Sequence, residues 1–210
     1  GFMRGYVDQR RRDPRDDLIT ALIAAEEAGE KLSTDELITT CILLLNAGHE
    51  ATVHSIGNGV KTLLETRTPS DVLAPDAVDG TVEEILRYDP PLHMFTRWAY
   101  EDIDVMGHSF RRGDQVGLLL AAANRDPKRF PDPDKFDIDR TNARTHLAFG
   151  KGPHMCVGNM LSRKEMLVAF DELLERLDNF AVADEKEIRI LPNILLRGVT
   201  HLPITFTRKA

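Results

Sequence analysis

The stretch "FGKGPHMCVG", residues 149–158, places one of the chain's two cysteines in a loop among glycines, directly before a long amphipathic segment. Gly150, Gly152 and Gly158 allow the backbone to come close to whatever packs on this loop. Unpaired N–H groups at the start of the following helix favour a negative charge on a nearby sulfur atom. These features alone leave two interpretations of Cys156: a thiolate that binds a metal, or a buried free cysteine beside a glycine-rich turn.

The composition of the 210-residue chain, 42% hydrophobic and 29% charged, is that of an ordinary soluble globular protein. The cysteines at positions 41 and 156 have no paired spacing, which argues against a disulfide framework and against a zinc ribbon. The formal charge of −7 argues against general affinity for nucleic acid or anionic lipid. Nothing resembles a secretory signal, and the longest apolar run, 116–123, is far shorter than the about 20 residues of a membrane span. We therefore expect a cytoplasmic protein with no membrane or nucleic-acid partner.

Turn and cap signals divide the first part of the chain into helices. The polar opening breaks at Pro14, and a short apolar segment stops at Gly29. Ser33 and Glu36 then stand in capping-box spacing and begin a long helix. Two consecutive prolines end a later helical segment, since they remove backbone donors. The predicted helices cover residues 2–13, 16–29, 33–65 and 81–89.

The pattern changes in the second half of the chain. Residues 95–120 predict short strands with turn signals, which form a small sheet. Residues 124–144, rich in Asp, Pro and Arg, predict an irregular but ordered loop. Behind the cysteine loop, apolar residues at helical spacing continue to Phe180 in two adjoining stripes, a pattern typical of a buried helix. Residues 188–206 predict two short strands, so the fold class is mainly α with small β-sheets (α+β).

The cysteine loop resembles the haem-binding signature of the cytochrome P-450 superfamily, Phe-Gly-x-Gly-x-His-x-Cys-x-Gly. Every fixed position is matched, by Phe149, Gly150, Gly152, His154, Cys156 and Gly158. The resemblance implies that Cys156 is the thiolate ligand of the iron of haem b, with the sulfur donating electron density that favours O–O cleavage. It also implies that His154 hydrogen-bonds a haem propionate and that Phe149 packs under the macrocycle near the sulfur.

Glu84 and Arg87 in "EEILR" stand three residues apart, so they share a helix face and can pair. Taken alone, they predict an exposed ion pair worth about 0–1 kcal/mol. The resemblance implies instead a buried structural pair that locks the irregular loop before the cysteine. "NRDPKRFPDPDKFDIDR", residues 124–140, resembles the meander of the family, with Arg140 as the expected third partner and Lys135 as the other candidate.

Further resemblances concern the haem and the substrate. Arg97 in "HMFTRWAYED" matches the arginine that family members use for a haem propionate, although taken alone it would be a strand-edge arginine. Residues 92–95 and 194–196 correspond to substrate-contacting segments. The predicted contacts are apolar, which indicates a lipophilic substrate. They are Leu44, Ala47, Met94, Phe95, Leu195 and Leu196.

The long predicted helix contains "LLNAGHEAT", with a glycine that costs about 1 kcal/mol against alanine inside a helix. The resemblance implies that Ala47 and Gly48 open a groove over the distal face of the haem, where dioxygen binds. Glu50 matches an acid that delivers protons. Ala51 stands where the family usually has threonine, and Thr52 follows about 100° further round the helix. We predict that a substrate hydroxyl or an ordered water replaces the missing alcohol.

A competing interpretation of the same helix is a metal site made by His49, Glu50 and His54. Zinc proteases of the His-Glu-x-x-His type carry their histidines four residues apart. His54 lies five residues after His49, about 140° round the helix, so the spacing argues against this site.

The resemblance runs from about Tyr6 to the C-terminus, whereas family members are about twice as long. We therefore interpret residues 1–210 as the C-terminal part of a single cytochrome P-450 domain whose N-terminal half is absent. This part contains the long distal helix, the Glu-x-x-Arg helix, the meander and the cysteine-ligand loop with its following helix.

Two functions are compatible with the sequence. The first is an oxidoreductase of the bacterial soluble type, a haem-dependent monooxygenase that oxidises a lipophilic small molecule. Its electrons would come from NAD(P)H through a ferredoxin or flavoprotein that docks near Cys156. The second is a non-catalytic fragment without haem that self-associates through apolar surfaces left exposed by the truncation.

Overall fold

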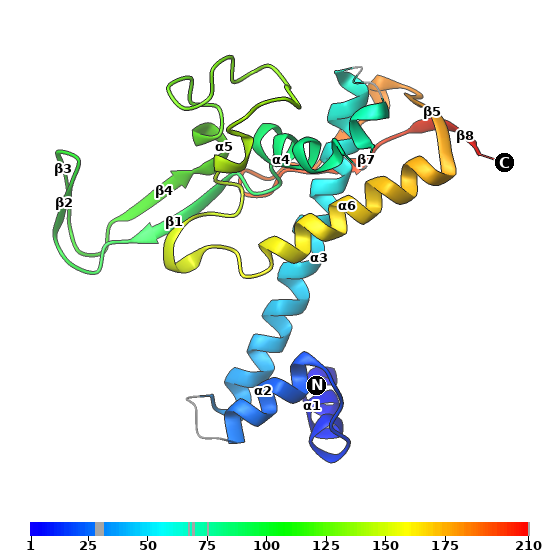
Figure 1. Cartoon of the computed structure of the whole chain (residues 1–210). Helices are drawn as coiled ribbons and strands as arrows, with labels where there is room; N and C mark the ends of the chain where they lie inside the picture. Colours follow the sequence, from blue (N-terminus) through cyan, green and yellow to red (C-terminus); the bar gives the residue numbers. More distant parts are fainter. Residues whose placement is uncertain (28–31, 67, 69, 75, 210) are drawn as a thin grey trace. The chain divides into compact units, whose positions relative to one another are not determined.

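The computed structural model describes residues 1–27, 32–66, 68, 70–74 and 76–209 (Figure 1). The chain folds into two compact units, Gly1–Glu50 and Ala51–Ala210, and each has its own hydrophobic core. Helix α3 (Thr34–Glu65) supplies the last element of the first unit and the first element of the second. The described elements of the first unit are helices, and the second unit combines helices with short antiparallel strands, which confirms the predicted fold class.

In the first unit, side-chain caps set the starts of the second and third helices. Its elements are α1 (Phe2–Arg12), α2 (Leu18–Glu27) and residues 34–50 of α3. Helix α2 begins two residues later than predicted, because the Asp17 carboxylate caps it and accepts a hydrogen bond from the Thr20 N–H at 2.8 Å. That bond and one from Arg10 lower the pKa of Asp17 to about 2. The predicted helix stop at Gly29 lies outside the described residues.

The predicted capping box opens α3. The Glu36 carboxylate accepts from the Ser33 N–H at 2.8 Å, and the Ser33 hydroxyl accepts from the Glu36 N–H at 3.3 Å. The bond from the Ser33 N–H, together with one that the Ser33 hydroxyl donates to the same carboxylate at 2.7 Å, lowers the pKa of Glu36. The buried apolar side chains of the first unit come from all three helices and are Val7, Ile23, Leu37 and Cys41.

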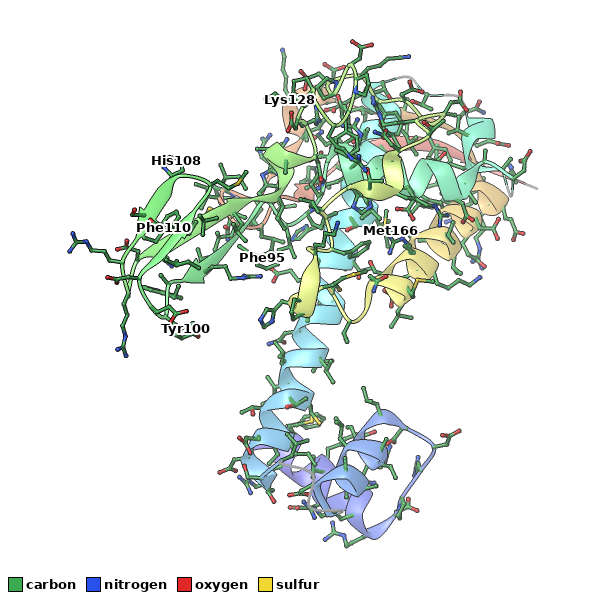
Figure 2. All side chains as sticks on the ribbon, turned by 60° about the vertical axis from the view of Figure 1, so that its left-hand side comes forward. Phe95, Tyr100, His108, Phe110, Lys128 and Met166 are labelled. Atoms are coloured by element: carbon green, nitrogen blue, oxygen red, sulfur yellow. The ribbon has the colours of Figure 1, made fainter. Side chains whose placement is uncertain are left out.

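The core of the second unit lies where α3, α4 (Val78–Tyr88) and α6 (Asn159–Arg176) pack together (Figures 1 and 2). Gly59 permits the close approach of α3 to α6, because a Cβ at this position would lie 2.7 Å from the ring of Phe170. The buried apolar members are Leu63, Val72, Leu73, Val82, Ile85, Leu86, Ala148, Met166 and Phe170.

The strands of the described residues pair as antiparallel two-stranded ribbons (Figure 1). The small sheet expected over residues 95–120 is present as two of these ribbons. The pairs are β1 (Met94–Trp98) with β4 (Gln115–Leu119), β2 (Ile103–Val105) with β3 (His108–Phe110), β5 (Leu177–Val182) with β8 (Ile204–Arg208), and β6 (Arg189–Ile190) with β7 (Val199–His201).

Single helical turns connect these elements. They are η1 (Ser70–Leu73), α5 (Leu120–Ala123), η2 (Ala143–Thr145), η3 (Gly152–His154) and η4 (Glu185–Glu187). The segment between α5 and η2 has no regular structure, as expected for the Asp- and Pro-rich loop. Within the described part of the chain, no helix combines the length and the apolar character that crossing a bilayer requires.

Several predicted boundaries are wrong. Helix α6 ends at Arg176, and the apolar residues up to Phe180 belong to strand β5, because their backbone pairs with β8. The segment expected to hold two strands contains β6, β7 and most of β8. Helix α4 begins at Val78 rather than near Thr81, whose buried hydroxyl donates to the Val72 carbonyl at 2.6 Å from inside the helix.

The prediction of a buried helix after the cysteine loop is also wrong in part. Met166 and Phe170 of α6 are fully buried in the core. Met160 is 72% exposed and Leu161 is 62% exposed, whereas Leu167 packs against the core, so the stripe that these residues form is buried only in part. Only one face of α6 therefore serves the core of the second unit.

Candidate functional site

Cys156 lies between η3 and the start of α6, three residues before the helix begins. Its side chain is exposed, so the interpretation as a buried cysteine is wrong, whereas Cys41 is buried in the first unit. The Cys156 N–H donates to the Phe149 carbonyl at 2.9 Å, and the Asn159 side-chain amide donates to the Cys156 carbonyl at 2.7 Å. Hydrogen bonds to its backbone N–H and to its carbonyl therefore hold Cys156 in place, while its thiol stays accessible.

The glycines of the loop leave room above it. Gly150 and Gly152 have φ angles of 69° and 79°, a region that favours glycine. A Cβ at Gly152 or Gly158 would meet no neighbouring atom within 4 Å, and residues 151–157 are all exposed. The loop thus presents an open cradle beside the thiol, which fits a flat prosthetic group held by one sulfur ligand.

Phe149 is half-buried between two basic side chains at the beginning of this loop. The Arg163 guanidinium lies 4.5 Å from the centroid of its ring, and the His146 ring lies 5.8 Å from it. His154, at the end of η3, is exposed on the loop.

A carboxylate that the sequence did not single out, Glu83, contacts both of these basic residues. Its oxygens lie 3.1 Å from His146 Nε2 and 2.6 Å from Arg163 Nε, and its side chain is 2% exposed. Burial alone would raise the pKa of Glu83, but the hydrogen bonds from His146 and Arg163 outweigh burial and lower the pKa to about 2. The only signal in the sequence was the acidic residue directly before the Glu-x-x-Arg motif.

The neighbouring carboxylate, Glu84, is fully buried and contacts two arginines. Arg87 donates to both Glu84 oxygens at 2.7 Å, and Arg140 Nε donates to one of them at 3.2 Å. The Lys135 ammonium is exposed and pairs with Asp137, so Lys135 contributes only its backbone carbonyl to this cluster. The charges of Glu84 and Arg87 are therefore compensated by each other and by Arg140. Charges buried away from water are stable only with such partners.

The same two arginines tie down the irregular loop. Arg87 donates to the carbonyls of Asn124 and Pro133 at 3.0 and 2.9 Å. Arg140 donates to the carbonyl of Pro131 at 2.6 Å. These bonds order a segment without regular structure that leads from α5 towards the cysteine loop.

Arg97 lies on β1, opposite Val116 of β4, and is exposed. Its guanidinium donates to the Thr96 carbonyl at 2.8 Å, so it contacts its own strand in this structure. In Figure 2, Phe95 lies at the end of the β1–β4 ribbon nearer to Met166, whereas His108 and Phe110 lie towards the other end.

Two predicted substrate segments, about 100 residues apart, lie side by side. Leu92 forms a β-bridge with Leu196, and the His93 N–H donates to the Leu195 carbonyl at 2.9 Å. Met94 and Phe95 follow directly on β1. The structure therefore brings four of the six predicted apolar contacts to one edge of the second unit.

The remaining predicted residues lie on α3. Leu44 lines an apolar hollow of the first unit together with Tyr6 and Leu18. Residues 45–50 are exposed, which includes Ala47, Gly48 and Glu50. The first residues of the second unit, Ala51 and Thr52, are half-buried, and the Ala51 carbonyl accepts a hydrogen bond from the Ser55 hydroxyl at 2.9 Å.

The competing metal site on α3 gains no support. The ring of His54 packs against Gly198, where a Cβ would lie 1.9 Å from His54 Nδ1. No three His, Cys, Asp or Glu side chains gather in a metal-binding arrangement within residues 1–27, 32–66 and the described remainder. His54 thus serves packing between α3 and the C-terminal segment of the second unit.

Known proteins share both the sequence and the fold. The family profile described as cytochrome P-450 matches residues 76–204. The "Biotin biosynthesis cytochrome P-450" of Bacillus subtilis is 43% identical over 209 residues, which cover 98% of this chain and 52% of that protein. The "Steroid C26-monooxygenase" of Mycobacterium tuberculosis is 37% identical over 209 residues, which cover 98% of this chain and 56% of that protein. The chain spans about half the length of the curated relatives it matches.

Solved structures agree with this relationship. A crystal structure of P-450 BioI, in complex with an acyl carrier protein ligated to hexadec-9Z-enoic acid, has a TM-score of 0.89 and 43% identity, covering 98% of this chain and 53% of that chain. A myxobacterial cytochrome P-450 in complex with myristic acid also has a TM-score of 0.89 and 43% identity, covering 97% of this chain and 51% of that chain. The chain therefore belongs to the cytochrome P-450 family.

Proposed function

We propose that the chain is part of a haem-thiolate monooxygenase in which Cys156 is the protein ligand of the iron. The observation that carries the proposal is an exposed thiol beside an open glycine cradle, with its backbone fixed to Phe149. When bound, haem b supplies an iron centre that activates dioxygen and allows one oxygen atom to enter an organic substrate. Under this proposal, the residues of this chain hold the haem, orient the substrate and deliver protons.

Several side chains of the second unit are suited to hold the macrocycle. Gly150, Gly152 and Gly158 leave space for close packing, and Phe149, whose carbonyl accepts the Cys156 N–H, would pack under the macrocycle. His154 and Arg97 are exposed hydrogen-bond donors for the two propionates. Glu84, Arg87 and Arg140 have an architectural role, since they are sequestered in their own buried network.

Proton delivery falls to residues of α3 under this proposal. Glu50 is an exposed acid, and Gly48 next to Ala47 keeps this part of the helix surface narrow. Ala51 has no hydroxyl, and Thr52 stands one residue further along the helix. A substrate hydroxyl or ordered water therefore takes the place of an alcohol at position 51.

The substrate class is a lipophilic small molecule. Met94, Phe95, Leu195 and Leu196 form an apolar edge, and Phe95 is 38% exposed. Leu44, on α3, is a further apolar residue that we propose contacts the substrate. Two relatives of known structure hold hexadec-9Z-enoic acid on an acyl carrier protein and myristic acid, which supports an aliphatic chain as substrate.

We propose that electrons come from NAD(P)H through a ferredoxin or flavoprotein that docks near Cys156. The exposed cations Lys151 and Lys164 flank this loop and suit an acidic partner. A cytoplasmic location remains a prediction from the sequence.

A second candidate function is a haem-free chain that self-associates. It is favoured by exposed apolar side chains within each unit, such as Leu43 and Leu45 in the first and Met160 and Leu161 in the second. Such surfaces promote association between copies when nothing covers them.

One spectrum of the purified 210-residue chain distinguishes the two functions. The chain is mixed with haem, separated from unbound haem by gel filtration, reduced under carbon monoxide and measured in the visible range. A strongly red-shifted Soret band, the signature of thiolate ligation, supports the monooxygenase. Absence of that band, with no haem in a pyridine extract and an oligomer by light scattering, supports the second candidate.

A further inference from the structure

Glu83 on α4 links two segments that flank the cysteine loop. His146 stands just before the loop, and Arg163 stands on α6 just after it. The Glu83 carboxylate accepts a hydrogen bond from Arg163 Nε at 2.6 Å, and a second guanidinium nitrogen lies at 3.2 Å. Glu83 also contacts His146 Nε2 at 3.1 Å, and the exposed Arg144 guanidinium lies further away, with its Nε at 3.9 Å. One buried carboxylate therefore clamps both ends of the segment that carries Cys156.

The bonds of His146 extend this clamp into the loop backbone. His146 Nδ1 accepts a hydrogen bond from the Ala148 N–H at 3.1 Å. Since Nδ1 is an acceptor, the hydrogen-bond network assigns the proton of the neutral ring to Nε2, which donates to Glu83. Glu83 thus fixes the ring orientation that holds the backbone directly before Phe149.

Phe149 passes the constraint on to the cysteine. Its ring contacts the guanidinium of Arg163 at 4.5 Å and the ring of His146 at 5.8 Å. Its carbonyl accepts the N–H of Cys156 at 2.9 Å. A continuous series of contacts therefore runs from Glu83 through two basic side chains to Phe149 and then to Cys156.

We propose that Glu83 is a positioning residue for Cys156, acting through His146, Arg163 and Phe149. The backbone part of this proposal rests on the geometry alone, and its importance for iron ligation rests on the proposed function. The lowered pKa of Glu83 supports it, because the carboxylate remains ionised at neutral pH and keeps both donors in place. A carboxylate that served only helix packing would not need one partner before the cysteine loop, His146, and another after it, Arg163.

The test measures amide hydrogen exchange by NMR in the 210-residue chain without added haem. The variant is Glu83→Gln, which keeps the size of the side chain but removes its charge. We expect the Cys156 N–H to exchange about tenfold to a hundredfold faster than in the wild type, the loss that follows when a charged hydrogen bond is weakened. The core amide of Phe170 should change far less.

Thr81→Val is the matched control on the same helix. It removes one buried hydrogen bond, from the Thr81 hydroxyl to the Val72 carbonyl, and leaves the Glu83 cluster intact. If it accelerates exchange at Cys156 as much as Glu83→Gln does, the effect is general destabilisation and the proposal is overturned. Exchange at the wild-type rate in Glu83→Gln also overturns it.

Arg163→Lys keeps the proposal testable if Glu83→Gln fails to fold. The Arg163 side chain is 20% exposed, and lysine preserves its charge while losing the paired nitrogens and the flat surface over Phe149. Faster exchange at Cys156 is expected, and an unchanged rate contradicts the proposal. Because this readout needs no haem, its failure is separate from a failure of the proposed function, which the carbon monoxide spectrum of the wild type decides.

Discussion

Replacing Arg140 by methionine removes one of the two cations that contact the buried Glu84 carboxylate. Arg140 donates to Glu84 at 3.2 Å and its side chain is 6% exposed. A hydrogen bond to a charged group is worth about 1.5–3 kcal/mol. Glu84 keeps Arg87 and the Asp137 N–H at 2.9 Å, so the loss stays below the about 3–5 kcal/mol that follows when a buried charge loses its whole partner. We expect Arg140→Met to lower the free energy of unfolding by about 2–3 kcal/mol.

The matched control is Lys135→Met, since Lys135 was the other candidate for third partner. Its side chain is 67% exposed and contacts Asp137 at 3.4 Å, so the expected change is within about 0.5 kcal/mol. Urea unfolding of the chain, fitted with a common m-value, measures both variants. A change below about 0.5 kcal/mol for Arg140→Met, or an equal loss for Lys135→Met, would refute the assignment of Arg140.

Three other predictions follow from the contacts. Gly59→Ala should lower the free energy of unfolding by about 1–3 kcal/mol, because the new Cβ would lie 2.7 Å from the Phe170 ring. Gly48→Ala in the same helix should raise the free energy of unfolding, because its Cβ would meet nothing within 4 Å and alanine favours the helix. Equal urea midpoints for the two variants would contradict this prediction. The folded-state pKa of Glu83, about 2, lies below the ordinary value of 4.5, so its contribution of about 3 kcal/mol is present above pH 4.5 and is lost as the pH falls towards 2. Glu83→Gln should therefore lose less stability than the wild type across that interval, and parallel pH profiles would count against the assigned pKa. In the haem-loaded protein, Ala51→Thr should change the fraction of reducing equivalents that reach product rather than peroxide, and unchanged coupling would argue that position 51 has no part in proton delivery.

Local signals predicted the helices that carry the motifs. The capping box of Ser33 and Glu36 forms as expected, and α4 ends before the two prolines. These features succeed because a cap or a proline acts within about four residues, over distances that the sequence itself sets. The spacing of Glu84 and Arg87 similarly placed both side chains on one helix face.

Long-range contacts were beyond the sequence pattern. Residues 177–182 have apolar spacing compatible with a helix, but their pairing with β8, about 25 residues later, makes them a strand. The partners of Glu83 lie 63 and 80 residues away, so neither spacing nor periodicity could reveal the cluster. The contact between Leu92 and Leu196 could be expected only from family resemblance, since nothing in either segment specifies the other.

The central claim is that Cys156 is the iron ligand, and paired serine variants test it most directly. The reduced carbon monoxide spectrum is recorded for the wild type, for Cys156→Ser and for Cys41→Ser, whose cysteine is buried in the first unit. We predict that the red-shifted Soret band is present in the wild type and in Cys41→Ser and is absent from Cys156→Ser. A band that survives in Cys156→Ser would contradict the claim.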